Sequence, residues 1–137
     1  MSSAVRLIRS HQLAQAVDYA YAATAEPSAR TVWVAGACPL DTNGQTVAAG
    51  DYAAQAHQVM RNLATALQEA GASLTDVAKT TVYVASTQQQ DLVTAWNVYR
   101  EHMGSHDVPS TLLGVTVLGY RDQLVEVEAV AVLPPTS

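Results

Sequence analysis

One amphipathic helix, flanked on both sides by segments rich in β-branched residues, constrains this chain more than any other feature. Asp51 can cap a helix that runs to about Ala70, and Gly71 follows where a left-handed C-terminal residue is favoured. The apolar side chains recur at three- and four-residue steps and form one stripe, made of Val59, Met60, Leu63, Leu67 and Ala70. A helix with a single apolar stripe must bury it against another layer.

The remaining periodic segments supply that layer. Strands are predicted at residues 5–8, 31–37, 45–47, 79–86, 111–118 and 124–133, with a turn at 41–44. A second helix is predicted at residues 88–103, with Trp96 and Tyr99 on its apolar face and Gly104 as its stop. This order is typical of an α+β fold with both helices on one face of a sheet. We expect one domain over residues 1–137, because this length supports one core.

Composition narrows the class of protein. Only 14% of the residues are charged and 49% are hydrophobic, so we expect apolar surface to be covered by copies of the same chain. A net charge of −5 offers no basic field to nucleic acid. No segment predicts a signal peptide or a membrane span, and the single cysteine, Cys38, fits a reducing compartment. We therefore expect a cytoplasmic protein with neither nucleic acid nor membrane as a partner.

Two carboxylates lie in the otherwise apolar last strand. Glu126 and Glu128 fall on one face, and the other face is apolar, with Val125, Val127, Ala129 and Ala131. Carboxylates in such a strand need a reason, because burying them is costly. Glu126 either holds a catalytic or structural water or pairs at a subunit boundary with Arg121 or Arg30. A structural role is favoured for Glu128.

Neither the histidines nor the cysteine predicts a metal site. His102 and His106 are four residues apart, but Gly104 lies between them and no carboxylate ligand pattern accompanies them. His11 and His57 are isolated in the sequence. Cys38 has no adjacent histidine and is expected to be a small buried hydrophobe. We expect no metal and no cofactor.

Five segments in fixed order carry a resemblance to a known family. They read Tyr-Ala-Tyr-Ala-Ala at 19–23, Trp-Val-Ala-Gly-Ala-Cys-Pro-Leu-Asp at 33–41, Glu-Ala-Gly-Ala-Ser-Leu-Thr-Asp-Val at 69–77, Thr-Thr-Val-Tyr-Val at 80–84 and Leu-Val-Glu-Val-Glu-Ala at 124–129. Together they resemble the Rid (reactive intermediate deaminase, or YjgF) family from about Tyr19 to Ala131. The matching family motifs include Phe-Val-Ser-Gly-Gln-Ile-Pro-Leu-Asp and a closing Val-Glu-Ile-Glu-Ala.

The resemblance implies a chorismate-mutase-like subunit, with a mixed sheet and two helices on one face. It implies a homotrimer whose sheets form a central barrel, with three small-molecule clefts between neighbouring subunits. In active members, an arginine binds the substrate carboxylate, and a water held by a glutamate and backbone carbonyls attacks an imine or enamine carbon. A bidentate guanidinium suits a carboxylate, and a carboxylate can orient a water and move protons.

Three positions depart from that pattern. Pro109 stands where active branches carry the arginine, Trp96 stands at the family's helical asparagine, and Ala35 replaces the serine before the cleft glycine. The positions that still match are Tyr19, Gly36 and Glu126. Because a proline cannot bind a carboxylate, the resemblance implies an arginine-lacking branch with a more apolar cleft.

The candidate site residues each have an ordinary structural alternative. We predict Glu126 and Tyr19 as catalytic, and as ligand contacts Gly36, Trp96, Pro109, Thr111 and His106. Tyr19 either donates its hydroxyl to a ligand carbonyl or packs at the rim. Trp96 either stacks on a ligand or packs helix against sheet. Thr111 and the neighbouring Ser110 either bind a ligand or are ordinary strand residues, and His106 is a candidate acid–base or anion-binding group.

Two functions stay open at this point. The first is water-mediated hydrolysis of an imine, enamine or related weakly charged metabolite, with 2-iminoacid deamination disfavoured by Pro109. The second is a non-catalytic trimer that binds a metabolite or a protein in the same clefts. Ribonuclease activity conflicts with the acidic balance and lacks a cluster of His, Lys and Arg.

Overall fold

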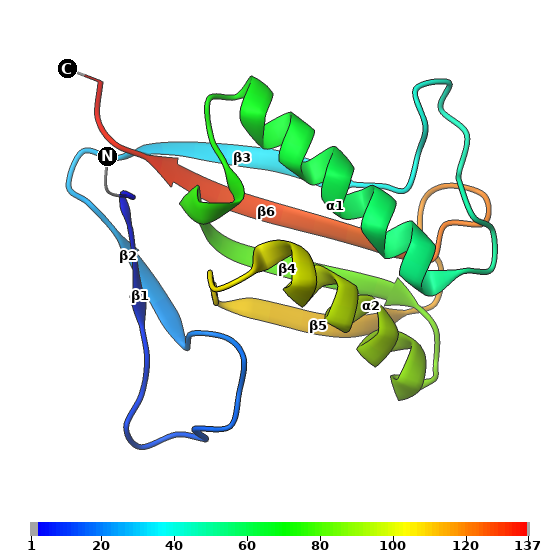
Figure 1. Ribbon diagram of the computed structural model, residues 1–137, viewed down its shortest axis with the longest axis horizontal. Coiled ribbons are helices and arrows are strands. Elements are labelled where there is room, and N and C mark those ends of the chain that lie inside the picture. Colours follow the sequence, from blue (N-terminus) through cyan, green and yellow to red (C-terminus); the bar gives the residue numbers. More distant parts are fainter. Residues whose placement is uncertain (1–2, 137) are drawn as a thin grey trace.

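A four-stranded sheet covered on one face by two helices forms the centre of the computed structural model, which describes residues 3–136 (Figure 1). The strands are β3 (Arg30–Ala37), β4 (Val77–Ala85), β5 (Ser110–Val115) and β6 (Val125–Leu133). Their spatial order is β3-β6-β4-β5; β4 and β5 are parallel, and β6 is antiparallel to both of its neighbours. The helices are α1 (Tyr52–Glu69) and α2 (Gln89–Met103). The predicted α+β fold, with two helices on one face of a mixed sheet, is confirmed.

Local signals set the bounds of α1. The Asp51 side chain accepts a hydrogen bond from the Ala54 backbone N–H at 3.0 Å, and Gly71 takes a φ of 85° just past the helix. The buried Gln55 then ties this helix to the sheet. Its amide donates to the Asp122 carbonyl at 2.9 Å and accepts from the Leu124 N–H at 2.7 Å. Gln55 thereby positions the chain where it enters β6.

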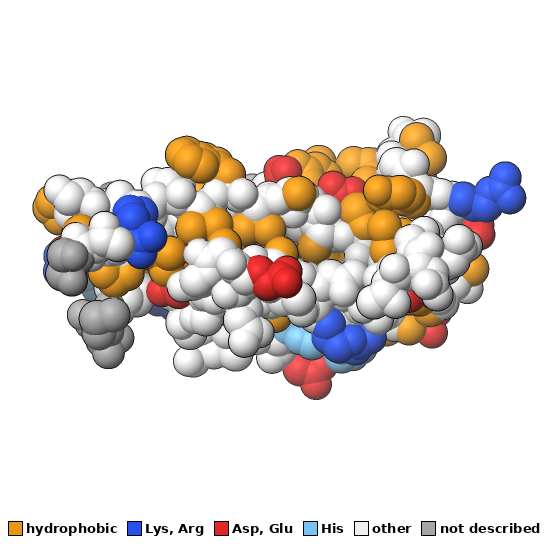
Figure 2. Space-filling model, turned by 90° about the horizontal axis from the view of Figure 1, so that it is seen from above, with side chains coloured by type: hydrophobic (Ala, Val, Ile, Leu, Met, Phe, Trp, Pro, Cys, Tyr) orange, Lys and Arg blue, Asp and Glu red, His pale blue; other side chains and the backbone are white. Residues whose placement is uncertain are grey.

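The two faces of the sheet differ sharply. Toward the helices, β4 and β6 present buried residues, including Val82, Val84, Val125 and Val127. On the opposite face Trp33 is 77% exposed, and no helix or strand among residues 3–136 covers it. Figure 2 shows hydrophobic side chains gathered along the upper side, away from the histidines. A large aromatic side chain exposed on an uncovered sheet face is typical of an interaction surface.

Three segment predictions need correction. Residues 45–47 form no strand, because only an isolated bridge joins Leu40 to Thr46 and the Asp41 carboxylate binds the loop N–H groups of residues 43 and 45. The last parallel pair of the sheet is Ala85 with Val115, so β5 ends there and does not continue to residue 118. A strand missed by the sequence, β2 (Ala22–Ala25), pairs antiparallel with β1 (Val5–Ile8) in a separate two-stranded sheet. The alanine-rich β2 carries little intrinsic strand preference.

Neither helix of the described chain has the length and apolar character needed to span a bilayer.

Candidate functional site

Three of the predicted site residues come together at one pocket. A pocket of about 440 Å³ is lined by Asp18, Tyr19, Trp96, Ser110, Thr111 and Leu112. It draws on the segment before β2, on α2 and on the start of β5, which are far apart in the sequence. Pro109 directly precedes this wall, and its carbonyl accepts a hydrogen bond from the Thr80 N–H at 3.1 Å. Tyr19, Trp96 and Thr111 therefore share a wall, with Pro109 at its edge.

The segment that carries Tyr19 is pinned to the connection between α2 and β5. Ala20 is 1% exposed, and its N–H donates to the Asp107 carbonyl at 2.6 Å. Arg9 also reaches Asp107, with 2.9 Å between its guanidinium and the carboxylate. Tyr21 packs edge-on against Tyr19, with ring centroids 5.6 Å apart. These contacts hold Tyr19 over the start of β5 although no regular element contains it.

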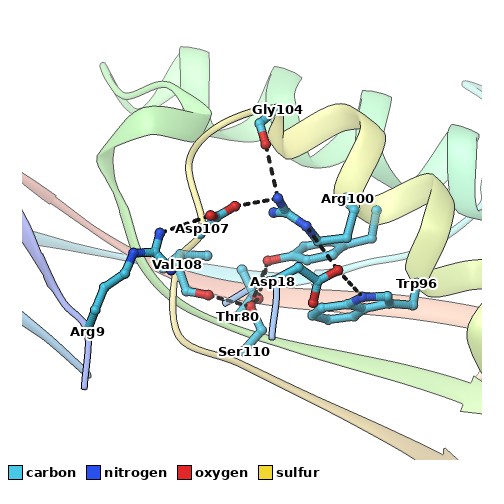
Figure 3. Close-up of polar contacts among 10 residues, drawn as sticks. Arg9, Asp18, Thr80, Trp96, Arg100, Gly104, Asp107, Val108 and Ser110 are labelled. Atoms are coloured by element: carbon cyan, nitrogen blue, oxygen red, sulfur yellow. Dashed lines mark hydrogen bonds and ion pairs between the residues drawn. The ribbon is translucent and has the colours of Figure 1, made fainter. Parts of the chain in front are cut away.

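An alternating chain of charges lies behind the pocket (Figure 3). The Arg100 guanidinium pairs with Asp107 and donates to the Gly104 carbonyl at 3.1 Å, and its Nε lies 3.5 Å from Asp18 Oδ2. The Trp96 indole donates to the same Asp18 oxygen at 3.0 Å. The Arg100 side chain is only 18% exposed and does not line the pocket. Carboxylates of its own chain therefore engage this arginine.

The hydroxyl groups of Ser110, Thr80 and Tyr99 form a hydrogen-bonded cluster beside the pocket. The Ser110 hydroxyl lies 2.7 Å from the Thr80 hydroxyl and 2.9 Å from that of Tyr99, and it donates to the Val108 carbonyl at 2.9 Å. Thr80 and Tyr99 are themselves 2.6 Å apart and almost fully buried. Burial is the main cause of the raised pKa of Tyr99. Ser110 is therefore committed to structure rather than free for a ligand.

The neighbouring Thr111 lines the pocket, but its hydroxyl is engaged on the uncovered face of the sheet. Its hydroxyl accepts a hydrogen bond from the Lys79 ammonium at 2.8 Å. Lys79 lines a separate depression of about 240 Å³ on the uncovered face, together with Glu128 and Trp33. The Tyr83 hydroxyl donates to Glu128 at 2.5 Å, which raises the pKa of Tyr83. Glu128 thus has a structural partner in its own sheet.

Glu126 and Gly36 form a second group. A β-carbon built on Gly36 would clash with the Glu126 carboxylate oxygen and would lie 2.8 Å from its Cδ, so the carboxylate needs the missing side chain. Gln123 is 4% exposed and donates its amide to Glu126 Oε1 at 3.0 Å, while the Cys38 thiol lies 3.5 Å from the same oxygen. Burial, and next the Glu126 charge, raises the pKa of Cys38 to about 11, which keeps the thiol protonated.

The proposed ionic partners of Glu126 lie elsewhere within this chain. Arg30 donates to the Pro134 carbonyl at 3.3 Å, and Arg121 lines a depression with Tyr120 and Gly44. Among the described residues, no cationic side chain forms an ion pair with Glu126. Pairing with an arginine across a subunit boundary stays a prediction.

Within one chain the two groups do not meet. Thr111 on β5 is paired with Thr81 on β4, and Thr81 is paired with Glu128 on β6. Glu126 lies two residues before Glu128 and is paired with Tyr83 on β4. One full strand therefore separates Glu126 from the wall that carries Thr111. Glu126 and Gly36 are absent from the residues that line the Tyr19 pocket. The predicted site residues therefore form two separate groups in the chain.

The histidines take other positions. His106 places its Nε2 2.7 Å from the Val77 carbonyl and does not line the pocket. His57, isolated in the sequence, pairs with His102 across the two helices, with 2.9 Å between Nδ1 and Nε2. Burial, and next the charge of His57, lowers the pKa of His102. No group of three or more His, Cys, Asp or Glu side chains within residues 3–136 is arranged to hold a metal.

Sequence reasoning missed Asp18 and Arg100, which the structure places at the pocket and directly behind it. One signal was available, because Asp18 is the only charged residue between positions 10 and 25. For Arg100 the sequence offers no signal, since an arginine near the end of a helix is ordinary.

Comparisons with known proteins agree on one family. The family model described as Endoribonuclease L-PSP matches residues 10–133. A RutC family protein of Pyrococcus abyssi is 36% identical over 100 residues, covering 73% of this chain and 76% of that protein. A 2-iminobutanoate/2-iminopropanoate deaminase of Rattus norvegicus is 30% identical over 135 residues, covering 98% and 96%. A crystal structure of a Rid family protein of unknown function from Yersinia pestis has a TM-score of 0.85 at 28% identity, covering 95% and 99%.

Proposed function

This chain belongs to the family described as Endoribonuclease L-PSP, which includes the Rid proteins, and we propose that it hydrolyses a small imine, enamine or related weakly charged metabolite. The reaction adds water across C=N and releases a carbonyl compound and ammonia. One observation carries the proposal: Glu126 Oε1 is held by Gln123, while Oε2 lies under Gly36 with no hydrogen-bond donor among the described residues. That oxygen is free to orient a water.

We further propose a homotrimer, because each chain holds two separated half-sites. Tyr19 and Trp96 line one, and Gly36 and Glu126 form the other. The uncovered sheet face, with Trp33 exposed, offers the apolar surface through which copies would associate. A neighbouring copy would bring its Glu126 to the pocket of Tyr19. Each cleft would then contain the full set of residues.

The proposed chemistry starts from the protonated imine and needs three proton transfers. As a water attacks the imine carbon, its proton passes to the Glu126 carboxylate, and the electron pair of the C=N bond moves to nitrogen, which gives a neutral carbinolamine. Tyr19 lines the pocket, and its hydroxyl, which has no hydrogen-bond partner among residues 3–136, would donate to the ligand. The proton held by Glu126 then passes to nitrogen. Finally the Glu126 carboxylate takes the proton of the new hydroxyl group as the C=O bond forms, and the C–N bond breaks to release ammonia.

The wall at Pro109 bears on the choice of substrate. Pro109 offers no charged group, and the nearby Arg100 is engaged by Asp18 and Asp107. The carboxylate of a 2-imino acid would find no free guanidinium among the described residues that line this pocket. We therefore propose a substrate without that carboxylate, in contrast with the relatives that are named 2-iminobutanoate/2-iminopropanoate deaminase.

The proline at position 109, where the family's active branches carry an arginine, also favours a second function. This is a non-catalytic trimer that binds a metabolite or a protein in the same clefts. The ribonuclease activity in the family's description is not carried over, because a net charge of −5 repels phosphate backbones. A single domain over residues 1–137 and a cytoplasmic location remain predictions.

Ammonia release tests the enzymatic proposal. We expect acceleration over buffer for a freshly generated carboxylate-free imine, little for 2-iminobutanoate, and a loss of about 100-fold in Glu126→Gln. No acceleration for either substrate would leave the binding function, and a preference for 2-iminobutanoate would refute the substrate argument.

Light scattering tests the trimer, which requires three times the 14.5 kDa chain mass. Mixed trimers of Tyr19→Phe and Glu126→Gln chains should regain activity that neither variant has alone, because some clefts would combine two intact half-sites. No recovery in mixtures shown to exchange subunits would refute the shared cleft.

A further inference from the structure

We infer that the pocket of Asp18 and Trp96 selects a cationic, N–H-donating ligand group, such as an amidinium or a protonated amine, over a carboxylate. The inference deepens the proposed function, because it names the ligand class of the same cleft. It does not require hydrolysis, since a binding trimer would show the same preference.

The Asp18 carboxylate is held in place with one oxygen free. Both of its contacts, from the Trp96 indole at 3.0 Å and from Arg100 Nε at 3.5 Å, fall on Oδ2. Its other oxygen accepts no hydrogen bond from the described residues. The Asp18 side chain lines the pocket and is 54% exposed, so the carboxylate can meet a ligand there. A carboxylate held by its own neighbours loses little freedom when a donor binds.

The cationic side chains near the pocket bind other groups of the same chain. Arg100 sits behind Asp18, is 18% exposed, and gives its Nη2 to Asp107 and the Gly104 carbonyl (Figure 3). Lys79 touches Thr111 but lies in the depression on the uncovered sheet face, which Glu128 also lines. Among residues 3–136, Asp18 is therefore the one charged side chain that lines the pocket. A ligand carboxylate would meet a like charge there.

The rest of the lining suits a flat or compact cation. Trp96 lines the pocket and is backed by Tyr99, with ring centroids 5.0 Å apart, and Tyr19 contributes a second aromatic ring. Aromatic faces attract cations, and tryptophan does so best. The Ser110 hydroxyl is used by Tyr99, Thr80 and Val108, so Asp18 and the Tyr19 hydroxyl are left to recognise a ligand.

Three isosteric probes separate charge from shape: benzamidinium, benzamide and benzoate. The chain has two tryptophans, so indole N–H resonances in NMR spectra report binding at a known place, and Trp96→Phe identifies the Trp96 signal by its loss. We expect titration of benzamidinium to shift the Trp96 signal and to give a dissociation constant about tenfold lower than that of benzoate.

Asp18→Asn is the decisive variant, because it keeps an acceptor for the Trp96 indole but removes the charge. Benzamidinium should bind about tenfold more weakly to it, benzamide should change less than about twofold, and benzoate should bind more tightly as Arg100 loses a counter-ion. Glu69→Gln removes the same charge from the exposed end of α1 and should leave all three affinities unchanged.

The inference is overturned if benzoate binds as tightly as benzamidinium, or if Asp18→Asn leaves their order unchanged. Failure of all three probes to shift the Trp96 signal at about 10 mM would overturn it as well, since even millimolar ligands register there. An absence of ammonia release alongside the expected probe order would refute the hydrolase and leave this inference standing.

Discussion

The substitution Gly36→Ala tests the close contact between Gly36 and the Glu126 carboxylate. An added β-carbon would lie 2.8 Å from Glu126 Cδ and 3.1 Å from its Cγ, and closer still to the carboxylate oxygen. Gly36 needs no left-handed backbone, so alanine meets a steric conflict and no backbone strain. The carboxylate is the mobile end of a side chain, and we expect it to swing away and lose its hydrogen bond from Gln123. That displacement should lower the free energy of unfolding by about 1–2 kcal/mol.

Urea unfolding at a fixed protein concentration measures this cost. Gly119→Ala is the matched control, because a β-carbon there meets nothing within 4 Å and its φ is not positive. A double-mutant cycle with Glu126→Ala isolates the clash, since Gly36→Ala should cost almost nothing once the carboxylate is gone. An equal cost of Gly36→Ala in both backgrounds would refute the reasoning.

Three further predictions follow from single contacts. Because the pKa of His102 is lowered from 6.5, the unfolded chain binds a proton at this residue more readily than the folded chain does. The free energy of unfolding should therefore be highest above about pH 6.5 and fall as the pH drops through the lowered pKa, and His102→Gln should flatten this slope. Replacing the fully buried Gln55 with leucine strips the Leu124 N–H and the Asp122 carbonyl of their partner, so unfolding should become easier by about 2–3 kcal/mol; a cost below about 0.5 kcal/mol would contradict this account. Cys38 should react with disulfide reagents with an apparent pKa of about 11, which Glu126→Gln should lower, as thiol-labelling rates against pH can show.

Family and fold could be predicted from the sequence because their signals are local. The Asp51 cap and Gly71 mark the two ends of α1. The alternation of apolar and acidic residues along β6 places Glu126 and Glu128 on one face of the sheet. The five motifs indicated the Rid family, and the match over residues 10–133 confirms it. Tyr19, Trp96 and Thr111 were predicted as site residues, and the structure brings them to one pocket.

The tertiary structure, by contrast, decided which side chains contact one another within the chain. Asp18 meets Trp96 across 78 positions, Arg9 meets Asp107 across 98, and His57 meets His102 across 45. The periodicity of the sequence determines on which face of a helix or strand a side chain lies. Which charged group it contacts depends on how segments far apart in the sequence pack together. That is why the sequence could show that no arginine stands at Pro109, while only the fold revealed that Arg100 approaches the same pocket and is held behind Asp18.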